Sequence, residues 1–405
     1  MKANSRYVAA VVLTLTGLPS IEPAKAIGVR LLHQDAEAVA RGNAFAATAD
    51  NPSAIYYNPA GITQLGGQNF ESNTFAVGYD IQYTSKNGVR ADTPDKVEFA
   101  NQLFYSAQLK ASRLFFGLGV YEPYGLSSTW EDGTPFRSLA TQSKLLYITF
   151  NPVLAWKITD SLSVAAGVTV NASHLDLRRG ILAPHDQFQF KGEGVGVGFN
   201  IGIMWQPHPM HSFGVRYFSA TDIDYDGSVE IHTKTPLLFP SSSEDANSGF
   251  HFPMHIAGGY SFRPTPDWNF EFDLDWTDWD SVNSVTVHKK SGNLVDVFDW
   301  ESSFNYLFGV TRYFHNGVSV SAGYSYIENS GPDATFHPAN SDMNFHVASL
   351  GVRYTQPRWS VGLTYQFGYG ERDVTNSAPS PVGETADGHY KFLSHSLSLS
   401  LGAKF

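Results

Sequence analysis

Strict alternation between apolar and polar residues recurs through most of the chain. The last residues show it most clearly, because Leu397, Leu399 and Leu401 alternate with serines. The same two-residue period runs through residues 162–173, 195–205 and 270–276. Side chains on a β-strand point to opposite faces in turn, so each stretch predicts a strand with one apolar face and one polar face.

The lengths of these strands and of their connections favour a membrane barrel over a soluble β-sandwich with a buried inner face. The strands run to about 10–15 residues, whereas soluble strands have about 5–6. Short turns alternate with long loops, as in outer-membrane barrels. Tight turns are expected at residues 110–113, 158–162, 206–212, 263–268, 314–317 and 356–358. Long polar loops are expected near residues 86–97, 123–143, 178–191, 230–252, 287–298, 329–343 and 371–389.

Six tight turns and seven long loops join fourteen strands, from near Asn69 to Phe405. The predicted fold class is therefore all-β, a 14-stranded antiparallel transmembrane β-barrel with both ends on the short-turn side. Phe405 closes an alternating last strand and resembles the signal by which barrel-insertion machinery recognises outer-membrane proteins. Aromatic residues near the strand ends fit interfacial girdles: Tyr121, Tyr124, Trp156, Trp205, Trp268, Trp276, Trp279 and Trp359.

The N-terminus has the pattern of a secretory signal peptide. Lys2 and Arg6 precede an apolar run over residues 8–18, and the segment closes with Ala24-Lys25-Ala26. A membrane anchor is the alternative, but the run is well short of the roughly 20 residues that span a bilayer. We expect residues 1–26 to be removed, residues 27–68 to precede the barrel, and residues 69–405 to form it.

Composition narrows the function classes. A net charge of −11 lacks the basic footprint of a nucleic-acid-binding protein. The absence of cysteine excludes disulfides, thiolate metal sites and a cysteine nucleophile. Only 16% of the residues are charged and 14% are aromatic, which fits many strands with one apolar face.

The segment before the first strand is predicted to lie inside the barrel as a plug. A barrel of about fourteen strands is too wide to be filled by its own side chains. Residues 42–61 are rich in Ala, Gly and Asn and carry two Asn-Pro steps, which set turns. A disordered leader is the alternative, but the segment is low in charge and holds Phe45, Ile55, Tyr56 and Tyr57.

Several stretches resemble one family. The run over residues 42–61, ending in Asn58-Pro59-Ala60-Gly61, strongly resembles the hatch of FadL/TodX-type outer-membrane transporters of hydrophobic compounds. Residues 116–126, 150–158 and 274–279 resemble barrel motifs of the same family. Similarity therefore extends from the hatch to the later strands.

The resemblance implies passive transport of long-chain fatty acids or other apolar molecules across the outer membrane of a Gram-negative-type bacterium. Family members capture ligand in a groove between extracellular loops and pass it to an inner pocket. A shift of the hatch then opens a route sideways through the wall, at a kink in the third strand. Here that strand holds Gly119 and Pro123, which can both interrupt pairing.

Two sets of residues are candidates for ligand contact. An amphipathic ligand needs an apolar sleeve and one cation for its head group. Arg216 and Arg353 lie on the inward face by alternation and can pair with a carboxylate. The favoured alternative is that these arginines balance the inward carboxylates Glu271, Asp273 and Asp275. The apolar candidates in the loops are Leu126, Trp130, Phe136, Leu139, Leu237, Leu238, Phe239, Phe250 and Phe252.

The sequence contains no recognisable catalytic, cofactor or metal motif. Asp273, Asp275, Asp278 and Asp280 are candidates for acid–base or calcium chemistry, but a solvated inner wall explains them more simply. The histidines, including His208 and His211, lack metal-ligand spacing. Residues 192–198 form a Gly-rich strand rather than a phosphate loop.

Two rival functions stay open at this stage. A general porin for small polar solutes would lack a working plug. An outer-membrane lipase or protease would need a Ser/His/carboxylate cluster at the rim. The expected partners are a hydrophobic small molecule, outer-membrane lipid and lipopolysaccharide, and the chain is expected to be a monomer that uses no cofactor.

Overall fold

The computed structural model describes residues 29–110, 112–234 and 240–405. The predicted signal peptide lies outside these residues. The strands are β1 (Gln68–Thr84), β2 (Arg90–Asp92), β3 (Lys96–Gln108), β4 (Leu114–Thr129), β5 (Gln142–Lys157), β6 (Leu162–Gly180), β7 (Gln187–His208), β8 (His211–Phe218), β9 (Thr221–His232), β10 (Ser242–Phe252), β11 (His255–Thr265), β12 (Trp268–Thr277), β13 (Ser284–Lys289), β14 (Leu294–Val297), β15 (Ser303–Tyr313), β16 (Val318–Ile327), β17 (Phe345–Thr355), β18 (Trp359–Val374) and β19 (Gly388–Lys404). The helical turns are α2 (Ala36–Ala40), α3 (Ala54–Tyr57), η1 (Pro59–Gln64), η2 (Trp279–Ser281) and η3 (Asp333–Thr335).

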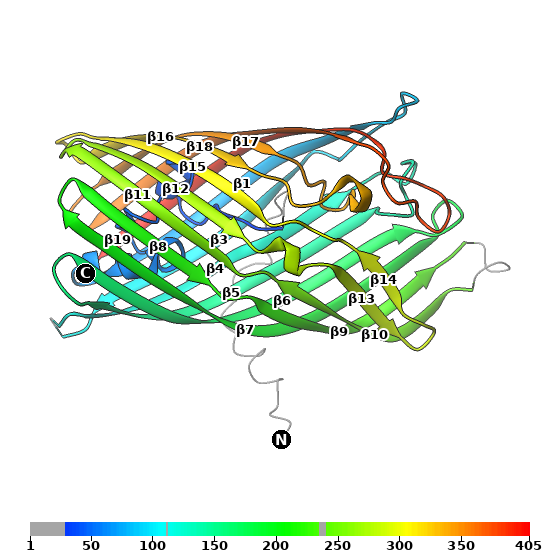
Figure 1. Ribbon diagram of the computed structural model, residues 1–405, viewed down its shortest axis with the longest axis horizontal. Coiled ribbons are helices and arrows are strands. Elements are labelled where there is room, and N and C mark those ends of the chain that lie inside the picture. The colour runs from blue at the N-terminus through cyan, green and yellow to red at the C-terminus, as the bar shows by residue number, and fades with distance from the viewer. Residues whose placement is uncertain (1–28, 111, 235–239) are drawn as a thin grey trace, which may run out of the picture.

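The strands form one closed antiparallel barrel (Figure 1). The first and last strands close it, because β1 pairs with β19 from Asn69↔Lys404 to Thr84↔His389. Five of the wall's long strands are interrupted, each being a pair of labelled strands: β2 with β3, β8 with β9, β10 with β11, β12 with β13, and β14 with β15. The described residues therefore form fourteen transverse strands, and the predicted fold class is confirmed.

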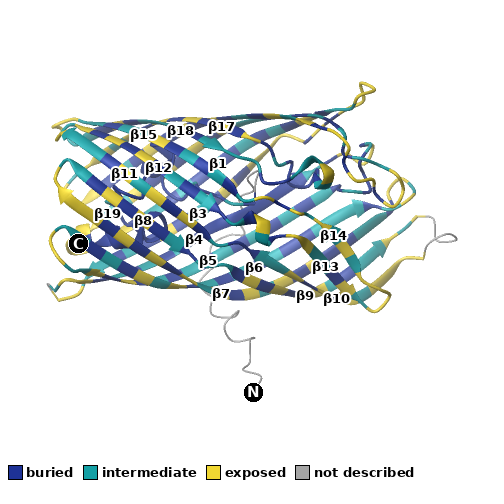
Figure 2. Cartoon of the chain, in the orientation of Figure 1, coloured by how far each residue is buried: buried dark blue, intermediate teal, exposed yellow. Residues whose placement is uncertain are grey.

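The apolar face of the wall points outward. On β19, Leu397, Leu399 and Leu401 are exposed, whereas Ser396, Ser398 and Ser400 between them are buried. Figure 2 shows the same alternation along the other strands. A soluble sandwich would bury the apolar face, so the lipid of a membrane is the environment that fits this surface.

The described part of the chain holds no helix that is long and apolar enough to cross a membrane.

The predicted turns are in place, but three of the predicted loops are largely strand: residues 178–191, 230–252 and 287–298. Breaks between strands coincide with the tight turns at residues 110–113, 158–162, 314–317 and 356–358. By contrast, β6 continues to Gly180 and β7 begins at Gln187, which leaves a short turn between them. Likewise, β13 and β14 occupy most of residues 287–298. These polar hairpins continue the wall because ladder hydrogen bonds form between backbones whatever the side chains.

The segment before β1 lies within the barrel, where Figure 1 shows it in blue. We call residues 29–67 the inner segment. Its helix α2 contacts β16, β17, β18 and β19, while η1 contacts β4, β5, β6 and β7. Because these strands belong to opposite parts of the wall, the inner segment crosses the lumen.

Candidate transport site

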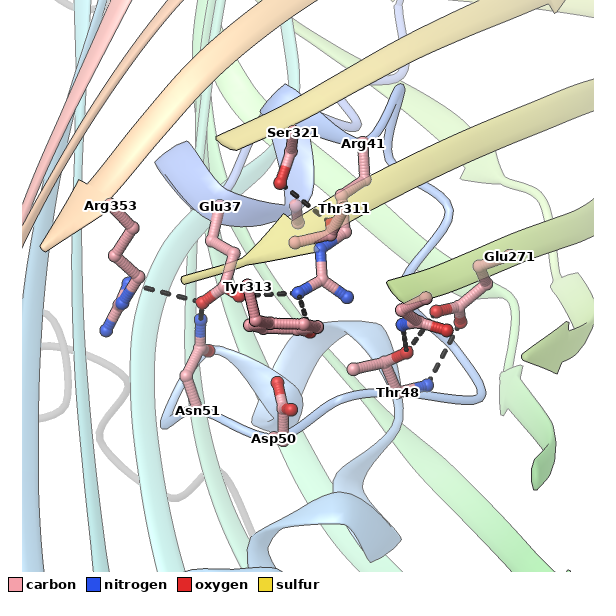
Figure 3. Close-up of polar contacts among 12 residues, drawn as sticks. Glu37, Arg41, Thr48, Asp50, Asn51, Glu271, Thr311, Tyr313, Ser321 and Arg353 are labelled. Atoms are coloured by element: carbon pink, nitrogen blue, oxygen red, sulfur yellow. Dashed lines mark hydrogen bonds and ion pairs between the residues drawn. The ribbon is translucent and has the colours of Figure 1, made fainter. Parts of the chain in front are cut away.

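Carboxylates of β12 bind the backbone of the inner segment. Asp273 Oδ2 accepts hydrogen bonds from the amides of Phe45 and Ala46, both at 2.8 Å. Glu271 Oε1 accepts from the amides of Ala47 and Thr48, at 2.8 and 3.0 Å (Figure 3). These amides would otherwise be buried without a partner, which is costly. The β12 carboxylates therefore hold the irregular backbone in place.

The expectation of a solvated inner wall is wrong for Asp273 and Asp275, which are 2% and 0% exposed, whereas Asp280 is exposed. Glu271 beside them is also buried, at 4% exposed. The inner segment covers them and supplies the hydrogen bonds that water would have supplied.

Arg216 and Arg353, the predicted head-group cations, point inward and are ion-paired. Arg216 Nη2 lies 2.5 Å from Asp275 Oδ2. Arg353 Nη1 lies 2.8 Å from Glu71 Oε1 and 3.4 Å from Glu37 Oε2. The favoured interpretation, balance by the β12 carboxylates, is thus correct for Arg216 and wrong for Arg353, which lies beside β1 and the inner segment.

Two further arginines, both in the inner segment, form buried ion pairs that were not predicted from the sequence. Arg30 donates to both oxygens of Asp275, from Nη1 to Oδ1 at 2.5 Å and from Nη2 to Oδ2 at 2.8 Å. Arg41 Nη2 lies 2.6 Å from Glu37 Oε1, as Figure 3 shows. Burial alone would raise the pKa of Glu37, but Arg41 and Arg353 hold that pKa below its usual range. The sequence signal that could have identified these arginines is that they are among the few charged residues in a segment otherwise low in charge.

The Asn58-Pro59-Ala60 motif anchors the inner segment to β7. Asn58 caps η1 by accepting from the Ala60 amide, and its Nδ2 donates to the carbonyls of Ala46 and Ile203, at 2.7 and 3.0 Å. Pro59 fits the first turn of the helix, where no amide donor is needed. A Cβ on Gly202 would lie 2.4 Å from Asn58 Oδ1, so this close approach requires glycine.

Ladder pairing between β3 and β4 ends partway along the two strands. These strands pair only from Gln108↔Phe115 to Leu103↔Val120, although β3 continues to Lys96 and β4 to Thr129. The ladder between β4 and β5 shifts register between Tyr121 and Tyr124. Beyond Val120, therefore, the β3-facing edge of β4 has lost its neighbouring strand.

The start of the inner segment occupies this free edge of β4. The Leu31 amide donates to the Pro123 carbonyl at 2.8 Å, and the Gly125 amide donates to the Val29 carbonyl at 2.9 Å. Arg30 and Tyr124 form the antiparallel bridge between them. Of the two residues predicted to mark an opening, Pro123 lies inside the register shift. Gly119 still pairs regularly with Phe104 and Asn151, one residue before pairing to β3 ends.

The described residues line two cavities inside the barrel. The larger, with an empty volume of about 700 Å³, is lined by residues 29–33 together with Trp279, Trp300, Asn340 and Phe345. The smaller, about 310 Å³, is lined by Tyr121, Pro123, Tyr124, Phe252 and His255 among others. The larger cavity therefore adjoins the start of the inner segment.

The structure divides the predicted ligand groove into two apolar clusters. Leu126 and Phe252 are buried in one cluster, with Phe250 packed against it. Trp130 and Phe136 are buried in the other, with Leu139 packed against it. Leu237, Leu238 and Phe239 lie outside the described residues.

A closed barrel with an outward apolar face and an occupied lumen defines an outer-membrane transport protein. Residues 21–405 match the family described as "Outer membrane protein transport protein (OMPP1/FadL/TodX)", and the chain belongs to that family. Its members are transport channels rather than enzymes, so this protein transports hydrophobic compounds at the outer membrane and the enzyme alternative is wrong.

Individual relatives are distant in sequence. The "Long-chain fatty acid transport protein" of Escherichia coli O6:H1 is 22% identical over 386 residues, which cover 84% of this chain and 80% of the relative. A solved FadL homologue of Pseudomonas aeruginosa is 18% identical, covers 93% of this chain and 100% of its own, and has a TM-score of 0.84. The toluene transporter TodX of P. putida is 16% identical, with coverages of 95% and 99% and a TM-score of 0.71.

Proposed function

We propose that this protein carries hydrophobic molecules passively through a plugged barrel, with long-chain fatty acids as the first substrates to test. Residues 1–26 act as a signal peptide and residues 69–405 form the barrel. Residues 27–68, which include the inner segment, act as the hatch. Movement of the hatch opens a lateral exit between β3 and β4. Relatives named for long-chain fatty acids and for toluene support an apolar substrate.

One observation supports the proposed exit between β3 and β4. The free edge of β4 is occupied by residues 29–31 of the hatch instead of by β3. A strand that is part of a movable segment can leave without breaking the rest of the barrel ladder. Its departure would connect the lumen with the lipid that surrounds the exposed Val97, Phe99 and Leu103 of β3.

Different parts of the hatch are held by different kinds of contact. Residues 45–48 and 58–63 are tied to the wall by Asp273, Glu271, Ser163 and the carbonyl of Ile203. Residues 29–31 are tied by two backbone hydrogen bonds and by Arg30. We assign the movement to the start of the hatch, because it is paired with the free edge of β4, and the anchoring to its Asn58-Pro59-Ala60 motif. This movement requires Arg30 to release Asp275.

Ligand capture is assigned to the apolar clusters at the long-loop end, which hold Leu126, Trp130, Phe136 and Phe252. A carboxylate that used Arg216 or Arg353 as its head-group partner would have to displace Asp275 or Glu71. A head-group role for either arginine therefore requires that its ion pair within the wall break first.

The remaining partners follow from the position of the barrel in the membrane. Phe405 is 80% exposed at the short-turn end and is available to barrel-insertion machinery. We propose a monomer that contacts outer-membrane lipid and lipopolysaccharide through its exposed apolar wall.

The experiment that separates this proposal from a general porin is single-channel conductance. The intact protein in a planar bilayer is expected to conduct little, and deletion of residues 27–61 from the mature chain is expected to raise conductance. In cells that lack their own transporter, the intact protein is expected to restore uptake of radiolabelled oleate. Large conductance by the intact protein, or no uptake of any hydrophobic compound, would contradict the proposal.

A further inference from the structure

Asp275 is shared by two arginines that belong to different parts of the molecule. Arg216 Nη2 lies 2.5 Å from Asp275 Oδ2, while Arg30 donates to Oδ1 at 2.5 Å and to Oδ2 at 2.8 Å. The three side chains are buried, with exposed fractions of 3% for Arg216, 6% for Arg30 and 0% for Asp275. Two buried cations therefore share one buried carboxylate, which needs only one of them for charge balance.

The ion pair of Arg216 with Asp275 lies entirely within the wall. The ladder from β8 through β11 to β12 places Arg216, Ala257 and Asp275 in one row. Because the buried residue between them is an alanine, the guanidinium can reach across β11 to the carboxylate. Arg216 is also held by the anchored part of the hatch, since its Nη1 donates to the Tyr56 carbonyl at 3.2 Å and its guanidinium lies 4.9 Å from the Tyr56 ring. This pair therefore does not depend on residues 29–31.

Arg30, by contrast, reaches Asp275 from the start of the hatch. The backbone on either side of Arg30 is hydrogen-bonded to β4, whereas its side chain contacts β11 and β12. Besides Asp275, its Nη1 donates to Thr277 Oγ1 at 2.7 Å and its Nη2 lies 2.9 Å from His255 Nδ1. A guanidinium has no acceptor, so this imidazole nitrogen accepts the hydrogen bond. The proposed departure of residues 29–31 breaks all these side-chain contacts together.

We propose that Arg216 is a positioning residue for transport, which keeps Asp275 paired while the start of the hatch is displaced. The inference rests on the proposed function, and specifically on the movement of residues 29–31. When Arg30 leaves, the wall retains one cation and one carboxylate. Without Arg216, the same departure would leave a lone buried carboxylate, which is strongly unfavourable. Arg30 thus stabilises the closed hatch, and Arg216 lowers the free energy of the open one.

Thiol labelling measures the opening directly, because the chain has no cysteine of its own. Val29 is 8% exposed, so the thiol of Val29→Cys should react with a maleimide mainly after residues 29–31 leave β4. Labelling would be followed on the purified full-length protein, and the initial rate of radiolabelled oleate uptake would be followed in cells. We expect Arg216→Met to slow both about tenfold, because only the open hatch leaves Asp275 unpaired. Arg30→Met should speed labelling about tenfold without reducing uptake.

Further variants separate this role from a purely structural one. Arg216→Lys keeps a positive charge beside Asp275 and should restore most of the labelling and uptake rates. Arg312→Met removes an arginine that is paired with Asp267 in the turn before β12, and it should change neither rate. Gel migration after heating would report the stability of each barrel. If Arg216 were only structural, Arg216→Met would lower the unfolding temperature and speed labelling instead of slowing it.

The outcomes separate this inference from the proposed function. Unchanged or faster labelling in Arg216→Met, or slower labelling in Arg30→Met, overturns the roles assigned to the two arginines but leaves transport of hydrophobic compounds standing. Absence of oleate uptake by the unsubstituted protein would contradict the proposed substrate, whereas the labelling rates would still decide how the two arginines share Asp275.

Discussion

The Leu31 amide donates a hydrogen bond to the Pro123 carbonyl at 2.8 Å, between the inner segment and β4. This contact lies where β3 has stopped pairing with β4. A segment that is not part of the barrel thus completes the ladder at a wall strand whose register shifts beside it. Backbone hydrogen bonding must be satisfied within a membrane, so removal of residues 29–31 requires another partner for this edge.

Valine at position 202 should displace the anchoring motif. A Cβ on Gly202 would lie 2.4 Å from Asn58 Oδ1 and 2.7 Å from Pro59 Cδ. Overpacking of this kind costs about 1–3 kcal/mol. We expect Gly202→Val to raise single-channel conductance and to lower the temperature at which the barrel unfolds, seen as altered gel migration after heating.

Gly258→Val is the matched control for that substitution. Gly258 lies on β11, and a Cβ there would meet nothing within 4 Å. Conductance and unfolding temperature should stay near the wild-type values. If Gly202→Val behaved like Gly258→Val, the close approach of Asn58 to β7 would not be important for sealing the lumen.

Replacement of Asp273 by alanine and by asparagine should have opposite effects on the protease resistance of the inner segment. Asp273 Oδ2 accepts both hydrogen bonds from the inner segment, whereas its Oδ1 has no partner among the described residues. The asparagine side chain keeps one accepting oxygen, but alanine leaves two buried amides unsatisfied, at about 1–3 kcal/mol each. We expect Asp273→Ala to make the inner segment sensitive to added protease in detergent. Asp273→Asn should remain resistant, and equal cleavage of both variants would contradict this assignment.

Loss of Arg353 should destabilise the barrel itself. Its partners Glu71 and Glu37 are 1% and 9% exposed, so Arg353→Met would leave the buried Glu71 without its cation and Glu37 with Arg41 alone. Breaking a buried pair in this way costs about 3–5 kcal/mol. The unfolding temperature should fall clearly, while Arg358→Met, at an exposed position of the next turn, should leave it unchanged. A fall in fatty-acid uptake without any loss of stability would instead favour a head-group role for Arg353.

The sequence predicted the wall better than the site, for physical reasons. Alternation such as Leu397–Ser398–Leu399 is local, so it specified strands, their number and the direction of each face. It could not specify which inward group meets which, because Arg353 and Glu71 are far apart in sequence and meet only when β17, β18, β19 and β1 lie side by side.

The end of pairing between β3 and β4 was also beyond the sequence. Gly119 and Pro123 are permissive residues near the break, but Gly119 keeps both of its ladder partners. The break depends on a competing strand, residues 29–31, whose sequence shows no strand period. Asn58-Pro59-Ala60 was recognisable by its resemblance to the family's hatch, and the structure shows that it forms a local unit of a cap and a helix-starting proline.

The proposed departure of residues 29–31 from β4 during transport can be tested by a reversible lock. The chain has no cysteine, so Leu31→Cys with Pro123→Cys introduces one disulfide between two residues joined by a backbone hydrogen bond beside the Arg30–Tyr124 bridge. Thr63→Cys with Ser163→Cys is the control, because these hydroxyls lie 2.7 Å apart in the anchored part of the segment. Oleate uptake would be measured in cells with each pair oxidised and then reduced. We predict that the oxidised 31–123 lock reduces uptake to that of cells without the protein, that reductant restores it, and that the 63–163 lock has no effect. Undiminished uptake with the 31–123 disulfide fully formed would contradict this movement.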